Sequence, residues 1–372
     1  MDLFVFGTLL HIPLLKTVSG DADIASKIRW AVRPGYRVSR VDGQVFPIMH
    51  EDPEGVAEGI IVSGLSENAL MRLDYYESAF EYQRIKFAVL DECQMSRNVT
   101  AYAPEAGRWQ TAEAWDREGW IAKFGRLTTI AAQEAMSGIE TTPATFMGAQ
   151  YPQMMARAAS RERAGLEEGT GDLGREDVQL VQARKTYAGF FNVEELDLTF
   201  KKFDGGVSDP VNRAVFVGVD CAVVLPYDPV RDRVLVVEQF RPGAYLRGDP
   251  NPWTVEPIAG RIDPGEEPEQ AARREAHEEA GVELLGLHCV SAAYPSPGTT
   301  TEYFFVYVGL CDLSDDIAGL GGLPSEAEDI RSHVMDWVAF DAALNNGAFK
   351  LLPLLVAGHW LARNRDTLRA AA

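Results

Sequence analysis

The spacing of hydrophobic and polar positions divides the chain into regions. From residue 1 to about residue 103, short apolar runs alternate with Gly, Pro and Asp, which is the pattern of strands and turns. The first apolar run, residues 3–15, is interpreted as a buried strand, and residues 67–77 as a short helix. This pattern predicts a small α+β domain at the start of the chain.

Residues 111–164 have a helical period instead. Their apolar positions fall on one helical face, at Trp120, Phe124, Leu127, Ala131 and Ala135. We therefore expect the whole segment to be helical, with a second helix over about residues 144–163. A stretch rich in Gly and acidic residues follows, and its composition is typical of a linker.

After the linker the strand pattern returns. Residues 214–240 and 302–340 contain apolar runs of strand length, while residues 267–280 and 351–370 have the spacing of helices. The predicted fold class is therefore α/β combined with α+β. We expect three parts: a first domain over residues 1–110, a helical connector and linker over 111–177, and a second domain over 178–372.

Composition narrows the possible partners. The chain has 35 Lys and Arg against 55 Asp and Glu, which gives a formal net charge of −20. Such a charge repels the phosphates of nucleic acids and anionic membrane surfaces, so we expect neither as a partner. No apolar run reaches the ~20 residues that a membrane-spanning helix needs. A phosphate-bearing substrate would need metal ions or a locally basic pocket.

The cysteines help to indicate the cellular compartment of the protein. The four are scattered without a C-x-x-C pair, which favours neither a disulfide framework nor a zinc site. No Lys or Arg precedes the first apolar run, as it would in a secretory signal. We therefore expect a cytoplasmic protein.

Residues 260–282 carry the strongest chemical signal. Glu275, Glu278 and Glu279 are spaced to share one helical face. Like charges at this spacing destabilise a helix unless solvent, Arg side chains or a cation compensates, and hard oxygen ligands suit Mg²⁺ or Mn²⁺. On these three residues alone, a solvated acidic helix face is the preferred interpretation.

The residues around these glutamates change that interpretation. The segment resembles the Nudix box in full, through Gly260, Glu266, Arg274, Glu275, Glu278, Glu279 and Gly281. Ala276 occupies a position where the family has Ile or Leu, and this difference removes no catalytic group. The resemblance implies an α/β/α sandwich with a mixed sheet. It also implies metal-dependent hydrolysis of a nucleoside diphosphate linked to another group.

The resemblance further implies roles for single residues. Arg274 and Glu266 would brace the loop of the box. Glu326 would be the general base beside Glu275 and Glu279, although an ordinary acidic surface loop is the alternative for its segment. The ligands of Mg²⁺ (or Mn²⁺) would be the carbonyl of Ala259 and the carboxylates of Glu275, Glu278, Glu279 and Glu328, with Glu278 binding directly or through water.

The flanks of the box resemble the subgroup that hydrolyses ADP-ribose, over almost all of residues 180–370. The implied substrate-binding residues are Phe190, Arg213, Arg241, Pro297 and Glu302. Phe190 would stack on adenine and Arg213 would lie near it, while Arg241 and Glu302 would contact phosphate or the terminal ribose. For Phe190 a core position, and for Arg241 and Glu302 surface positions, are the structural alternatives.

The implied reaction is the hydrolysis of ADP-ribose to AMP and ribose 5-phosphate. Alternatives are another ADP-sugar or nucleoside diphosphate derivative, or a non-catalytic ADP-ribose sensor coupled to the N-terminal domain. A complete set of Glu275, Glu279 and Glu328 argues against a pure sensor. The resemblance also implies a homodimer through the second domain, with some substrate contacts supplied by the other subunit.

The first domain resembles the gamma-glutamylcyclotransferase-like (AIG2-like) family. The resemblance rests on FVFGTLL at the start of the chain and on LMRLDYYES around Glu77. It implies a small mixed β-barrel in which Glu77 acts as acid and base, and in which Gly7 and Thr8 belong to a loop that offers backbone N–H groups to a carboxylate. Phe6 and Ser78 replace the family's usual Tyr and Gly, so a retired enzyme serving as a binding module is the alternative.

Overall fold

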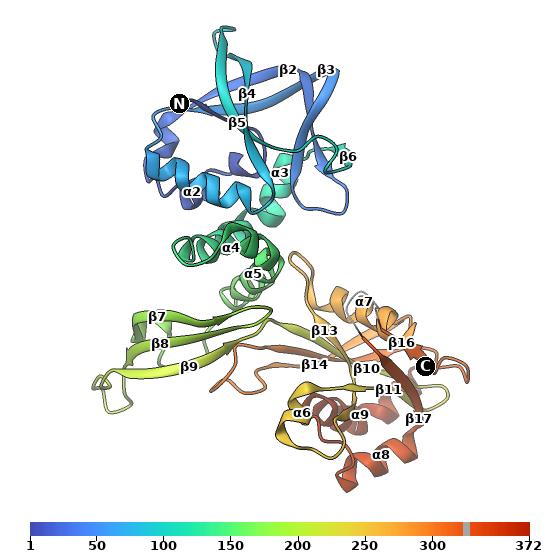
Figure 1. The fold of residues 1–372 in the computed structure, drawn as a ribbon. Coiled ribbons are helices and arrows are strands. Elements are labelled where there is room, and N and C mark those ends of the chain that lie inside the picture. Colours follow the sequence, from blue (N-terminus) through green and yellow to red (C-terminus); the bar gives the residue numbers. More distant parts are fainter. Residues whose placement is uncertain (323–327) are drawn as a thin grey trace. The chain divides into compact units, whose positions relative to one another are not determined.

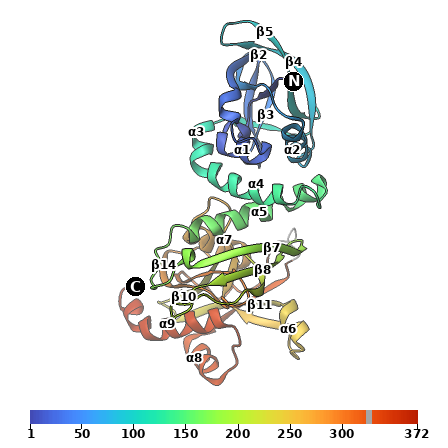
Figure 2. The ribbon, with the colours of Figure 1, turned by 90° about the vertical axis from the view of Figure 1, so that its left-hand side faces the viewer.

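The computed structural model describes residues 1–322 and 328–372. The chain forms two compact units, Met1–Glu167 and Glu168–Ala372, which are coloured blue to green and green to red in Figures 1 and 2. Within the described ranges, no helix is both long and apolar enough to cross a membrane.

The first unit contains a closed barrel. Its strands pair in the order β3, β1, β5, β4, β2, and β2 returns to pair with β3. β1 and β5 are parallel, whereas the neighbouring pairs are antiparallel. The mixed β-barrel predicted for this domain is thus confirmed, with strands β1 (Leu3–Val5), β2 (Ile28–Val41), β3 (Pro47–Val62), β4 (Tyr82–Asp91) and β5 (Ser96–Pro104).

Two expectations for this unit are wrong in part. Only residues 3–5 of the first apolar run are a strand, and the run continues into helix α1 (Ile12–Ser19). Pro13 fits the first turn of that helix because the N–H that it lacks would be unpaired there anyway. Residues 111–114 were expected to be helical but form β6 (Thr111–Ala114), which pairs with β2.

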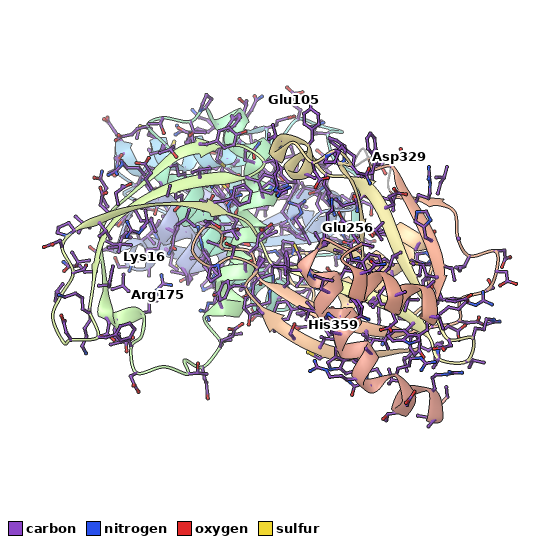
Figure 3. The ribbon with its side chains drawn as sticks, turned by 90° about the horizontal axis from the view of Figure 1, so that it is seen from below. Lys16, Glu105, Arg175, Glu256, Asp329 and His359 are labelled. Atoms are coloured by element: carbon purple, nitrogen blue, oxygen red, sulfur yellow. The ribbon has the colours of Figure 1, made fainter. Side chains whose placement is uncertain are left out.

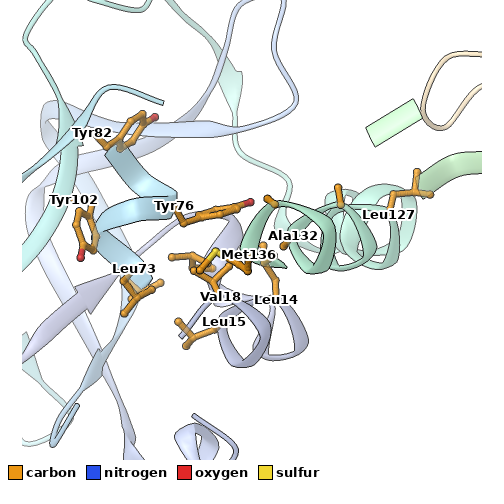
Figure 4. Packing of buried hydrophobic residues seen from close by; sticks show 14 of the residues in the cluster. Leu14, Leu15, Val18, Leu73, Tyr76, Tyr82, Tyr102, Leu127, Ala132 and Met136 are labelled. Carbon is orange, nitrogen blue, oxygen red and sulfur yellow. The ribbon is translucent and has the colours of Figure 1, made fainter. Parts of the chain in front are cut away.

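Helices pack against the barrel and share its core. α2 (Glu67–Ser78) starts at Ser66, whose hydroxyl accepts a hydrogen bond from the N–H of Ala69 at 3.1 Å. Figure 4 shows side chains of α1, α2 and α4 meeting in one cluster. The helices that follow β6 are α3 (Arg117–Trp120), a π-helical turn (Ile121–Gly125), α4 (Arg126–Ser137) and α5 (Ala144–Ala164).

The second unit is built on a mixed sheet. The strands run in the order β14, β15, β10, β11, β17, β16, with β10 and β15 parallel. β12 pairs with β11, and β13 pairs with β10. The strands are β10 (Cys221–Asp228), β11 (Arg233–Phe240), β12 (Trp253–Glu256), β13 (Ile258–Arg261), β14 (Gly286–Ala293), β15 (Phe304–Leu310), β16 (Leu320–Gly321) and β17 (Ile330–Asp336).

Alternating residues of the central strands face opposite layers of helices. Ala222 and Val224 of β10 pack with α7 (Pro268–Ala280), while Val223 and Leu225 pack with α8 (Trp337–Asn346) and α9 (Leu352–Ala370). A strand with two buried faces is what a sheet between helical layers requires. The predicted α/β/α sandwich is therefore confirmed.

A second, three-stranded sheet belongs to the same unit. It consists of β7 (Val178–Ala188), β8 (Asn192–Phe200) and β9 (Val211–Val217). Its strand β9 contacts the segment that precedes β15, where Phe216 exchanges backbone hydrogen bonds with Thr299 and Thr301. Almost every residue of β7 is exposed.

Candidate active site

A cleft of about 1860 Å³ crosses the second unit. Its walls come from the turn between β7 and β8, the strands β12 and β13, the short helix α6 (Pro242–Arg247) and the face of α7. Figure 3 shows the side chains of this unit with Glu256 labelled near their centre. The predicted site residues that line the cleft are Phe190, Arg241, Ala259, Glu275, Glu278, Glu302 and Glu328.

Local sequence signals explain where α7 begins and ends. Pro268 occupies the first turn of the helix, and the side chain of Gln270 accepts a hydrogen bond from the N–H of Glu267 at 3.1 Å. Gly281 ends the helix in the left-handed conformation with a φ of 63°, which favours glycine. These signals fix both ends of the helix that carries the three glutamates.

Gly260 lets Glu275 approach the loop before α7. A Cβ atom at residue 260 would lie 1.8 Å from Oε1 of Glu275, closer than any side chain allows. The carboxylate of Glu275 therefore lies against the backbone that immediately follows Ala259. This contact gives a physical reason for glycine at the first position of the box.

Arg274 braces the loop as expected. Its guanidinium donates to Glu266 at 3.0 Å and to the carbonyl oxygen of Arg261 at 2.9 Å. The same group also donates to Glu275 at 2.6 Å and to Glu278 at 3.0 Å. Arg274 thus offsets the repulsion between the carboxylates on this helical face.

Glu279 is the most buried of the candidate ligands. Glu279 is only 2% exposed, and its Oε2 atom has no hydrogen-bond partner among the described residues. Burial raises the pKa of Glu279 to about 9, with further contributions from the charges of Glu275 and Glu328. Burial likewise raises the pKa of Glu275 to about 7, against the opposing effect of Arg274.

The donors fit a hard divalent cation. As they stand, no three His, Cys, Asp or Glu side chains of residues 1–322 and 328–372 are arranged as a metal site, and Arg274 binds two of the candidates. However, the candidates are all oxygen donors, as Mg²⁺ and Mn²⁺ prefer. The unpartnered oxygen of Glu279 and the position of Glu275 beside Ala259 are features that a cation would satisfy.

Arg241 is held by a residue that the sequence did not single out. Its Nε donates to Glu256 at 2.8 Å and its Nη2 at 2.6 Å, and Glu256 is only 2% exposed. Thr254 also donates to Glu256. The carboxylate therefore takes the edge of the guanidinium that Nε and Nη2 form. The sequence signal for Glu256 is an acidic residue at the end of a short strand whose other residues are Trp, Thr and Val.

The remaining predicted substrate residues divide into two groups. Phe190 lies under the guanidinium of Arg261, 4.7 Å from the ring centre, and Glu302 packs against Gly218. Burial raises the pKa of Glu302. By contrast, Pro297 and Arg213 are not among the described residues that line the cleft, where Pro295 is found instead. Glu326, the predicted general base, lies outside the described residues.

The first unit holds its own candidate residues. Gly7 precedes a short turn over Thr8–Leu10 and lies against Pro47, whose Cγ would be 3.3 Å from an added Cβ. Glu77 is half-buried at the end of α2. Burial raises the pKa of Glu77 to about 8. A carboxyl group with this pKa can hold or release a proton near neutral pH.

Known proteins match both units. The family model "NUDIX domain" matches residues 219–355, and the model "Gamma-glutamyl cyclotransferase, AIG2-like" matches residues 3–120. The ADP-ribose pyrophosphatase of Escherichia coli is 36% identical over 196 residues, which cover 53% of this chain and 93% of that protein. The chain belongs to the Nudix family. Its second unit is the Nudix hydrolase domain, and its first is a gamma-glutamylcyclotransferase-like domain, as the sequence predicted.

Other Nudix relatives differ in their named substrates. The ADP-ribose pyrophosphatase of Haemophilus influenzae is 37% identical over 164 residues, 43% of this chain and 75% of that protein. The GDP-mannose pyrophosphatase of Cronobacter sakazakii is 27% identical over 154 residues, 41% of this chain and 80% of that protein. Nudix hydrolases cleave nucleoside diphosphate derivatives and generally use a divalent metal ion.

Proposed function

We propose that the Nudix domain hydrolyses ADP-ribose to AMP and ribose 5-phosphate in the presence of Mg²⁺. The observation that carries this proposal is the cleft itself, which collects the acidic face of α7 and the side chains of Phe190, Arg241 and Glu302 on common walls. The relatives named ADP-ribose pyrophosphatase match at 36% and 37% identity over 196 and 164 residues, whereas a GDP-mannose pyrophosphatase that is also 36% identical matches over 118 residues. The longer matches also support ADP-ribose.

Different residues of the chain would bind the metal ion, the phosphates and the adenine. The carbonyl of Ala259 and the carboxylates of Glu275, Glu279 and Glu328 would hold Mg²⁺, with Glu278 in direct or water-mediated contact. When bound, the ion supplies charge neutralisation at the pyrophosphate and a more acidic water. Arg241, held by Glu256 through Nε and Nη2, would donate its Nη1 to a phosphate oxygen, and Phe190 would stack on adenine. Glu326 is the proposed base.

The test is release of AMP from ADP-ribose with and without Mg²⁺, beside GDP-mannose, ADP-glucose, NADH and FAD. Mg²⁺-dependent turnover of ADP-ribose above the other compounds is the expected result. Faster turnover of GDP-mannose or ADP-glucose would indicate that this nucleotide sugar is the substrate instead. Tight binding of ADP-ribose without turnover would instead support the sensor that the sequence left open.

We further propose that the protein is a homodimer through its Nudix domain. Strand β7 is exposed along almost its whole length, and it carries the apolar residues Val178, Leu180 and Val181, which are 45%, 55% and 65% exposed. Apolar strand residues in water favour pairing with another chain. Sedimentation equilibrium tests this, and a monomer at micromolar concentration would contradict it. We also propose a cytoplasmic location, because the four cysteines are scattered along the sequence in a pattern that favours neither a disulfide framework nor a zinc site.

A second activity is proposed for the first unit. The half-buried Glu77, with a pKa of about 8, supports proton transfer to or from a gamma-glutamyl compound during its cyclisation. The test is release of 5-oxoproline from gamma-glutamyl amides by the wild-type protein and by Glu77→Gln. Release that requires Glu77 is expected, whereas no release from any amide would leave this unit as a binding module.

A further inference from the structure

Helix α5 lies outside the residues that the gamma-glutamyl cyclotransferase model matches, because that match ends at residue 120. It nevertheless packs against the end of α2, where Glu77 lies, within the same unit. A Cβ atom at Gly148 of α5 would be 2.1 Å from the carbonyl oxygen of Ala79. The backbones of the two segments therefore touch, and only glycine permits this approach.

Tyr151 extends the contact between α5 and the segment that carries Glu77. Its hydroxyl group is 2.7 Å from that of Tyr76, and its ring centre is 4.9 Å from the ring centre of Phe80. Tyr76 and Phe80 precede and follow Glu77 on the same segment. Figure 4 shows Tyr76 extending from α2 toward the helices that follow the barrel.

The charge of Glu77 also acts on three tyrosines near it. Burial raises the pKa of Tyr151, and the nearby charge of Glu77 contributes to this rise. The pKa values of Tyr76 and Tyr82 are raised by burial first and by Glu77 as well. Glu77 is thus close enough to these three tyrosines to raise their pKa values, and one of them, Tyr151, comes from α5.

Helix α5 is held firmly in place. Arg157 of α5 donates to the carboxylate of Glu134 on α4 at 2.7 and 3.0 Å, and both side chains are at most 3% exposed. Met147 and Met155 of α5 are also buried in the core of the unit. Breaking such packing would be costly. The helix therefore acts as a fixed wall of the unit.

We propose that α5 is an added wall of the site around Glu77, and that Tyr151 limits which ligands reach this carboxyl group. The site then takes compact ligands, such as a gamma-glutamyl compound with a small amine part. The ligand class rests on the cyclotransferase activity proposed above, whereas the wall rests on the contacts of α5 alone.

The wall can be tested without any substrate. The full-length protein is treated with a water-soluble carbodiimide and glycinamide, and labelling of single carboxyl groups is followed by peptide mass spectrometry. Tyr151→Ala removes the ring, and Gly148→Ala forces α5 away from Ala79. Phe146→Ala is the matched control, because Phe146 is an aromatic residue of the same helix that is 43% exposed. We expect several-fold faster labelling of Glu77 in the first two variants and the wild-type rate in the control.

Glu134 reports whether a variant has merely loosened the unit. This carboxylate is buried in its pair with Arg157, so it reacts only when α4 and α5 separate. Faster labelling of Glu77 with Glu134 still protected supports the proposal. If Glu134 also reacts, Tyr151→Leu decides, since it keeps apolar packing without the ring. A wild-type rate at Glu77 in every variant that keeps Glu134 protected would overturn the proposal.

Substrate size gives a second readout. Release of 5-oxoproline is compared for gamma-glutamyl methylamide and the bulkier gamma-glutamyl anilide. The wild type should favour the methylamide, and Tyr151→Ala should shift the ratio toward the anilide. An unchanged ratio in an active Tyr151→Ala protein contradicts the wall. If neither amide reacts while labelling shifts as expected, the cyclotransferase proposal fails and the wall stands.

Discussion

Each unit of the protein holds a glutamate whose pKa is raised by burial, but the two have opposite surroundings. Glu279 lies among charges, with Glu275, Glu328 and Glu256 raising its pKa and Arg241 lowering it. Glu77 has no charged group among the causes of its shift, and its neighbours include three tyrosines.

This difference indicates different chemistry. Several carboxylates gathered around one buried acid repel each other, and a divalent cation relieves that repulsion while keeping all of them ionised. A single carboxyl group among neutral rings has no use for a cation, and its raised pKa suits proton transfer near neutral pH. Burial alone therefore does not define a role, whereas the charge of the neighbours does.

The largest effect is expected from Glu279→Gln, which keeps the shape of the side chain but removes its charge. We expect turnover of ADP-ribose to fall at least ~10²-fold, because a metal ligand is lost. AMP release at saturating Mg²⁺ measures this. Glu77→Gln is the matched control in the other unit and should retain wild-type turnover. Equal turnover in Glu279→Gln and the wild type would remove Glu279 from the metal site.

Gly260→Ala should have the next largest effect. The added Cβ would displace the carboxylate of Glu275, and a misplaced catalytic group costs about tenfold or more in rate. The melting temperature should change little, because the displaced atoms are at the end of a flexible side chain. Gly319→Ala is the control, since nothing lies within 4 Å of a Cβ at that position. Full activity of Gly260→Ala would show that Glu275 need not touch this loop.

The stability of the first unit should depend on pH through Glu77. Its pKa rises from an ordinary value of 4.5 to about 8 on folding. Between pH 4.5 and pH 8, the folded state therefore keeps a proton on Glu77 that the unfolded state has lost. The stabilisation is complete below about pH 4.5 and is lost as pH rises toward 8. Urea unfolding at pH 5 and pH 8 should show this loss in the wild type but not in Glu77→Gln. A parallel loss in both proteins would contradict the assignment.

The smallest effect is expected from the hydroxyl pair of α2 and α5. Tyr76→Phe and Tyr151→Phe should each cost about 1 kcal/mol of unfolding free energy, and the double variant should cost less than their sum. Tyr75→Phe is the control, because the buried Tyr75 hydroxyl has no partner among the described residues and its removal should cost nothing. Strictly additive losses would mean that the two hydroxyl groups do not interact.

Local patterns predicted the parts of the molecule that depend on neighbouring residues. The period of the glutamates placed them on one face of α7, and the proline and glycine near its ends set its length. By contrast, residues 3–15 are apolar throughout, which does not distinguish a strand from a helix. The structure separates them at the turn after Gly7.

Contacts between distant segments could not be predicted in this way. Glu256 holds Arg241 across two paired strands, and no local pattern marks this pair. Tyr151 meets Tyr76 from a helix 75 positions further along the chain. Both contacts depend on tertiary packing, which decides where a side chain of ordinary type becomes part of a site.

We propose that the charged surroundings of Glu279 make the second unit a metal-dependent hydrolase of ADP-ribose. The most direct measurement is AMP release from ADP-ribose by the wild type and Glu279→Gln over a Mg²⁺ titration. We expect turnover that requires Mg²⁺ and is nearly lost in the variant. Turnover that is independent of Mg²⁺, or equal in the two proteins, would contradict it.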